Sequence, residues 1–117
     1  MAQRQSKAGS GNGGNHVEVS VVNGVISVKP DSLPVTDHNV VVEWEIVNSD
    51  GWTFPKWEDG IKLNRHHGDF SNGASDGSGK LYTMRDKNSE KRTHKYTVRV
   101  TNGGPPLTLD PDIRNEG

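Results

Sequence analysis

The clearest pattern in the chain is an alternation of hydrophobic and polar residues over residues 39–47. Because successive side chains of an extended strand point to opposite faces, this alternation predicts a half-buried β-strand. Glu43 and Glu45 fall on the outer face, which indicates that this face meets solvent, as it does in many antiparallel sheets. The inner, core-facing side consists of Val40, Val42, Trp44 and Ile46.

Two further segments give strong strand signals. Residues 17–21 and 25–28 flank Asn23-Gly24, and this dipeptide between two apolar runs predicts a β-hairpin, because its tight turn requires positive φ angles. Residues 96–101 alternate in the same way as residues 39–47 and predict a second half-buried strand.

The remaining segments are weaker. We expect short strands at residues 60–63, 81–84 and 107–109. Residues 64–80 hold four Gly and three Ser and predict a long surface loop, and residues 85–95 predict a charged connection.

Together these elements predict an all-β fold. No 11-residue window has the apolar spacing of a helix, and about six or seven short strands separated by turns favour a single antiparallel β-sandwich of the Greek-key type. We expect the sandwich to cover residues 16–117. Residues 1–15 are rich in Gly, Asn and Ser and predict a disordered tail.

Composition narrows the classes of function. The 117 residues make one small domain, and a formal charge of −1 gives no overall attraction to nucleic acid. No segment approaches the roughly 18 apolar residues of a membrane span, so we expect no membrane insertion. No secretory signal is visible, which favours a cytoplasmic location. The absence of Cys excludes disulfides and thiolate metal sites.

Three segments resemble a known family. The sequence Gly-Val-Ile-Ser-Val-Lys-Pro-Asp at 24–31, the Trp44 strand with Asn-Ser-Asp-Gly-Trp-Thr-Phe-Pro at 48–55, and Tyr-Thr-Val-Arg-Val-Thr at 96–101 are similar to cupredoxin-like sandwiches. The same segments fit an immunoglobulin-like sandwich nearly as well. Residues 107–113 resemble the end of small bacterial proteins of this type.

The resemblance implies the scaffold without its copper. A blue-copper site needs two His and a Cys with a weak axial ligand. Where the family places its first His, this chain has Phe54-Pro55-Lys56, and where the family places Cys it has Thr101-Asn102. We therefore expect no metal and no cofactor.

Aromatic residues form the first candidate site. Trp52, Phe54 and Trp57 lie within six residues, with Pro55 between them. Rings at a strand end can form a platform for a sugar or a protein partner, or they can close the end of the core. Both alternatives remain open from the sequence.

Basic residues form the second candidate site, for an anion or an acidic partner: Arg85, Lys87, Lys91 and Arg92. The alternative is a solvated connection whose charges discourage edge-to-edge aggregation. No aromatic residue lies among them, so the stacking part of a single-stranded nucleic-acid site is missing.

Histidines form the third candidate site. His66 and His67 with Asp69 could hold Zn²⁺ or Ni²⁺ weakly, although neighbouring side chains of an extended chain point in opposite directions. A solvated loop is the alternative. No nucleophile–His–acid arrangement is recognisable, and we expect no catalytic residues and no enzyme.

The sequence thus favours a non-enzymatic binding or structural module on a metal-free cupredoxin-like sandwich. Its partner would be a protein or a carbohydrate. One alternative is a carbohydrate-binding module that uses Trp52 and Trp57, and another is a small metal-dependent hydrolase that uses His66 and His67. The oligomeric state stays open.

Overall fold

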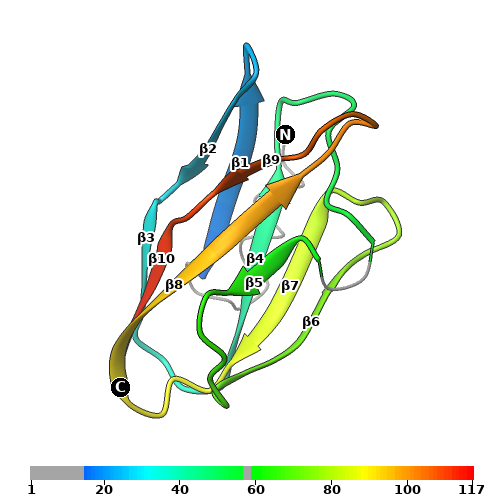
Figure 1. The fold of residues 1–117 in the computed structure, drawn as a ribbon. Helices are drawn as coiled ribbons and strands as arrows, with labels where there is room; N and C mark the ends of the chain where they lie inside the picture. Colours follow the sequence, from blue (N-terminus) through cyan, green and yellow to red (C-terminus); the bar gives the residue numbers. More distant parts are fainter. Residues whose placement is uncertain (1–14, 57–58) are drawn as a thin grey trace, which may run out of the picture.

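The computed structural model describes residues 15–56 and 59–117, and these residues contain ten strands and no helix (Figure 1). The first sheet has the order β2-β1-β4-β7-β6, with β1 His16–Val22, β2 Val25–Lys29, β4 Val40–Ile46, β7 Leu81–Asp86 and β6 Phe70–Ser75. The second sheet has the order β3-β10-β8-β5, with β3 Ser32–Val35, β10 Asp112–Glu116, β8 Lys91–Val100 and β5 Ile61–Leu63; β9 Leu107–Leu109 also pairs with β8. Within the described ranges, no helix is long and apolar enough to span a membrane.

The all-β fold is confirmed, and its sheets are mixed. β1 pairs in parallel with β4, and β10 pairs in parallel with β3, whereas the other strand pairs among the described residues are antiparallel. The expectation of six or seven antiparallel strands was therefore too simple. Because β2 and β3 follow one another but belong to different sheets, the chain crosses between the sheets at Pro30-Asp31.

The predicted hairpin is present as β1 and β2. Val22 lies directly opposite Val25, and the two turn residues between them have positive φ, 53° at Asn23 and 76° at Gly24. Asn and Gly tolerate this left-handed conformation better than other residues do, which explains why the chain turns at this position.

Trp44 lies at the centre of the core, as the alternation in β4 predicted. Its side chain is 0% exposed and meets the rings of Tyr82 and Tyr96 edge to face, at centroid distances of 6.1 and 5.4 Å. Its Nε1 donates a hydrogen bond to the Tyr96 hydroxyl at 2.9 Å. Burial raises the pKa of Tyr96 to about 12. These contacts join the two sheets, because Trp44 belongs to the first and Tyr96 to the second.

The outer face of β4 differs from the expected open surface. Glu43 and Glu45 point outward, but both are mostly covered, because the His16 ring lies between them at 3.3 Å from Glu43 and 3.4 Å from Glu45. A neighbouring strand therefore shields these carboxylates from solvent.

Three segments correct the sequence-based expectations. Residues 70–75, expected as part of a loop, form edge strand β6, whose pairing with β7 shifts register between Ser71 and Ala74. β8 begins at Lys91, so the charged connection shrinks to residues 87–90. β10 follows β9 and was not expected.

The structure describes one residue of the expected tail, Asn15. Asn15 is buried, and its carbonyl accepts a hydrogen bond from the Glu43 amide at 3.0 Å. The rest of the expected tail, residues 1–14, lies outside the described residues.

The strand directions give the sandwich two different ends. The hairpin end, at the top of Figure 1, carries residues 23–24, 47–56, 76–80 and 101–106. The network end, at the bottom, carries residues 36–39, 64–69 and 87–90 and the C-terminus.

Candidate functional site

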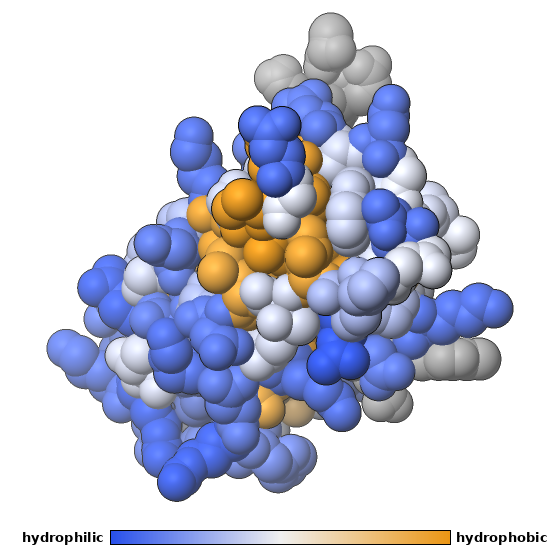
Figure 2. All heavy atoms as spheres, turned by 45° about the horizontal axis from the view of Figure 1, so that its top comes forward, coloured by the Kyte–Doolittle hydropathy of each residue, from blue (hydrophilic) through white to orange (hydrophobic). Residues whose placement is uncertain are grey.

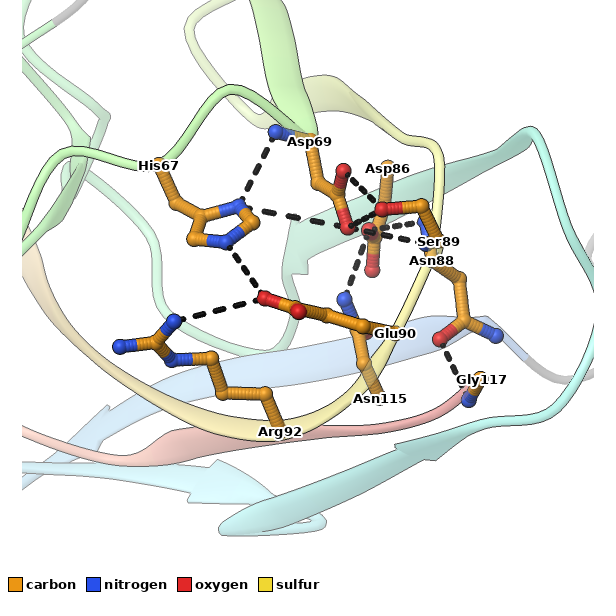
Figure 3. A network of polar contacts seen from close by, with 9 residues as sticks. All are labelled: His67, Asp69, Asp86, Asn88, Ser89, Glu90, Arg92, Asn115 and Gly117. Atoms are coloured by element: carbon orange, nitrogen blue, oxygen red, sulfur yellow. Dashed lines mark hydrogen bonds and ion pairs between the residues drawn. The ribbon is translucent and has the colours of Figure 1, made fainter.

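A buried carboxylate lies at the centre of the network end (Figure 3). Asp86 continues the inward side of β7 after Tyr82 and Met84 and is 0% exposed. Its Oδ1 accepts hydrogen bonds from the Asn88 amide at 2.9 Å and from the Asn115 side chain at 3.0 Å. Burial raises the pKa of Asp86, because desolvation of the carboxylate outweighs these two hydrogen bonds.

Asn88 ties three segments of the chain together. Its Nδ2 donates to the carbonyls of Val35 and Asp37, both at 3.1 Å, and its Oδ1 accepts from the Gly117 amide at 2.9 Å. The residue is fully buried and has a φ of 53°. Its amide side chain therefore satisfies three backbone groups, among them the buried carbonyl of Val35.

A second carboxylate, Asp69, is held by Ser89. The Ser89 hydroxyl donates to Asp69 at 2.7 Å, and the Ser89 amide donates at 2.9 Å. Desolvation opposes ionisation of Asp69, but the Ser89 hydrogen bonds and the nearby His67 and His94 outweigh it, so the pKa of Asp69 falls below its usual value.

His67 links this network to the surface (Figure 3). Its Nδ1 accepts a hydrogen bond from the Asp69 amide at 3.1 Å, which places the proton of the neutral ring on Nε2. Nε2 then donates to Glu90 at 3.1 Å, and Glu90 also accepts from Arg92 at 3.4 Å. The hydrogen bonds from His67 and Arg92 lower the pKa of the Glu90 carboxyl.

His94 lies beneath His67, with the two ring centroids 4.7 Å apart. It is 6% exposed, and its Nε2 has no hydrogen-bond partner among the described residues. Burial, together with the nearby His67 and Arg92, lowers the pKa of His94.

Two hollows flank the loop at residues 64–69. One, of about 340 Å³, lies against the first half of β8 and is lined by cationic and imidazole groups, including Arg65, His66, His67, Arg92, His94 and Lys95. The other, of about 500 Å³, lies between β5 and β6 and has Phe70, Tyr82 and Met84 in its lining. His66 and His67 border both hollows.

The predicted aromatic site is only partly placed. Phe54 is 3% exposed and packs its ring against Tyr82 in the core, so it offers no ring face to a ligand. Trp52 is half-buried against the core, and its carbonyl accepts a hydrogen bond from Lys80 Nζ at 2.7 Å. Trp57 lies outside the described residues.

The predicted basic residues do not form one surface. Arg85 and Lys87 are exposed, and Arg85 lies on the outer face of the first sheet, because Asp86 and Met84 beside it point inward. Lys91 lies on the outer face of the second sheet, opposite in side to His94. Arg92 alone borders one of the hollows.

The two candidate histidines have different surroundings. His66 is exposed, whereas His67 is partly buried and bonded at both ring nitrogens. Residues 15–56 and 59–117 contain no group of three His, Cys, Asp or Glu side chains that could hold a metal ion.

The hairpin end carries exposed hydrophobic side chains. Val22 and Val25 are 61% and 66% exposed and lie directly opposite one another beside the turn. Figure 2, with the top of Figure 1 turned forward, shows a patch of hydrophobic side chains amid polar ones. Leu107 of β9, which lies near β2, is also only partly buried.

The sequence pointed to His67 and Asp69 but not to the other buried polar residues of the network, Asp86, Asn88 and His94. A usable signal was present, because Asp86 and Asn88 continue the inward alternation of β7, and His94 continues that of Tyr96 and Val98 in β8. Extending the alternation past the last hydrophobic residue would have predicted that these side chains point inward.

No protein-family model matches this chain, and no curated protein matches its sequence.

Proposed function

We propose that this protein is a non-enzymatic binding module, built on a cupredoxin-like sandwich without copper ligands, that docks onto a protein partner through its hairpin end. The observation that carries the proposal is the pair of exposed valines, Val22 and Val25, on the outer face of the β1–β2 hairpin. Hydrophobic side chains gathered at the surface of a small domain are typical of interaction sites.

The mixed sheets support a cupredoxin-like scaffold over an immunoglobulin-like one. An immunoglobulin sandwich is built from two antiparallel sheets, whereas both sheets of this chain contain a parallel pair. At the positions where the resemblance expects copper ligands, Phe54 packs in the core and Thr101 pairs with Thr53. Neither side chain is a strong metal ligand.

The geometry of the hairpin suits a docking element. Five residue pairs hold β1 against β2, so the two valines are presented on an ordered strand pair. Little conformational entropy is then lost when a partner covers them, which favours affinity from a small contact.

Affinity capture with three forms of the protein tests the proposal: wild type, Val22→Thr/Val25→Thr, and Ser20→Thr/Ser27→Thr as the matched control. Threonine keeps the branched strand-forming shape and removes hydrophobic surface. The control changes the neighbouring cross-strand pair on the same face of the same hairpin.

We expect one set of proteins to be captured by the wild type and the control and to be lost with the valine variant. Equal capture by all three forms would contradict the proposal. A glycan screen that gives saturable binding abolished by Trp52→Ala would favour the carbohydrate-binding alternative instead.

A further inference from the structure

The hollow of about 340 Å³ at the network end lies along an unpaired edge of β8. β10 pairs with residues 91–95 on one edge of β8, whereas β5 on the other edge pairs only with residues 96–98. Past the end of β5, the Asn64 amide still donates to the Lys95 carbonyl at 2.9 Å, and no pairing with β8 follows in residues 65–69. The hollow therefore forms where the second sheet loses a strand.

The charged side chains that line this hollow are all positive. Arg65, Arg92 and Lys95 contribute three cations, and no carboxylate lines this hollow among the described residues. Lys95 Nζ donates a hydrogen bond to the Asp110 carbonyl at 2.9 Å. Lys95 therefore adds positive charge to the hollow, but its ammonium group already has a hydrogen-bond partner. Within the described part of the chain Arg65 forms no ion pair, which leaves its guanidinium available.

Glu90 already shows how an anion can be held at this place. Its carboxylate accepts from His67 Nε2 at 3.1 Å and from Arg92 at 3.4 Å, and both donors line the hollow. The Glu90 side chain is half-exposed, so it can leave these donors at little cost. An oxyanion that enters the hollow would replace it and would gain Arg65 as an additional donor.

We propose that this hollow binds a compact oxyanion, a phosphate or sulfate group, with Arg92, Arg65 and His67 as its donors and Glu90 as an internal competitor. The planar guanidinium groups suit the paired oxygens of such groups. The volume accommodates a small ligand with a single charged group. This site lies at the opposite end from the valine pair, so it does not depend on the proposed function.

NMR titration of the protein with inorganic phosphate, at constant ionic strength and pH 7, tests the site, and a parallel titration with sulfate compares the two anions. We expect saturable shifts of the amide signals of residues 64–67 and 92–95. Arg92→Gln should weaken phosphate binding by about 10-fold or more, since a hydrogen bond to a charged group is lost. Arg65→Gln, in a separate loop, should weaken it in the same direction.

Two further variants make the test specific. Arg99→Gln removes the same charge from the other end of β8 and should leave the affinity within about twofold, because exposed charges beyond a Debye length are screened. Glu90→Gln should tighten phosphate binding several-fold, because the competing carboxylate is gone. Equal weakening by Arg92→Gln and Arg99→Gln, no response to Glu90→Gln, or the absence of saturable shifts for both anions would each overturn the proposal.

Discussion

The two ends of this sandwich each contain an asparagine with a φ of 53°, Asn23 and Asn88, and the surroundings of these two residues differ in every other respect. Asn23 is exposed in a two-residue turn between two exposed valines. Asn88 is fully buried and bonds through its side chain to two other segments, residues 35–37 and Gly117. The same residue type with the same φ therefore closes a local turn at one end and holds separate segments of the chain together at the other.

The two ends also differ in the interactions that fix their structure. In the Asn23-Gly24 turn of the hairpin end, local backbone geometry determines the shape, so the neighbouring side chains of Val22 and Val25 are free to present hydrophobic surface. At the network end, carboxylates and amides are buried, and their satisfaction requires that several segments keep their positions. Substitutions should therefore cost much more stability at the network end than at the hairpin end.

The largest expected effect is that of Asn88→Ala. Two carbonyls and one amide would lose their partner, and alanine disfavours the positive φ, so we expect a loss of about 3–5 kcal/mol in the free energy of unfolding. Urea denaturation monitored by tryptophan fluorescence measures this change. A loss below about 1 kcal/mol would show that water replaces the asparagine and that the network end is not fixed by it.

The second effect concerns Ser89→Ala, which removes the hydroxyl donor of Asp69. We expect a loss of about 1–2 kcal/mol at pH 7. Because the pKa of Asp69 is lowered in the folded state, its ionised form stabilises the protein above the unfolded pKa, and this contribution is lost as the pH falls through the folded pKa.

The difference between wild type and Ser89→Ala should accordingly shrink when denaturation is repeated in acid, between about pH 4 and pH 2. A difference that stays constant over this range would mean that the hydroxyl stabilises the fold independently of the charge on Asp69.

The third effect is that of Asn23→Ala at the hairpin end. The Asn23 side chain forms no hydrogen bond among the described residues, so the substitution removes only the tolerance of asparagine for a positive φ. We therefore expect the free energy of unfolding to fall by about 1 kcal/mol. The same denaturation assay gives the ratio to Asn88→Ala. Equal costs for the two substitutions would remove the distinction between the ends.

The smallest effect is that of Val22→Thr/Val25→Thr. Since both side chains are exposed, we expect a change within about 0.5 kcal/mol, as for ordinary surface substitutions. Calorimetry of the double variant checks this. A large loss of stability would mean that the valines pack against the domain and are not available to a partner.

The strands with strong local signals could be predicted from the sequence. Asn23-Gly24 needs only its own backbone preferences to turn, and the alternation around Trp44 reports one buried face. β6, with Asn72 and Gly73 inside it, carries no such signal, because pairing with β7 rather than intrinsic propensity makes it a strand.

The candidate site was harder to predict because its geometry depends on distant segments. The two buried side chains of β10 are Ile113 and Asn115, so the alternation of hydrophobic and polar residues that marks a strand is weak in this segment. Asn115 is buried because its side chain bonds to Asp86 in a distant strand, which the sequence alone does not reveal. Similarly, Arg65 and Arg92 are 27 positions apart, and the end of β5 brings them to one hollow. Sequence proximity instead grouped Arg85 with Arg92, which the fold separates.

Native-state hydrogen exchange compares the two ends most directly. The amides of Asn88 and Ser89 donate to buried carboxylates, so we predict that they exchange only with the free energy of global unfolding. The turn amides of Asn23 and Gly24 should exchange through local opening, with a far smaller free energy. If Asn88 and Ser89 exchange as readily as Asn23 and Gly24, the buried hydrogen bonds do not hold the network end in place, which would contradict the distinction between the two ends.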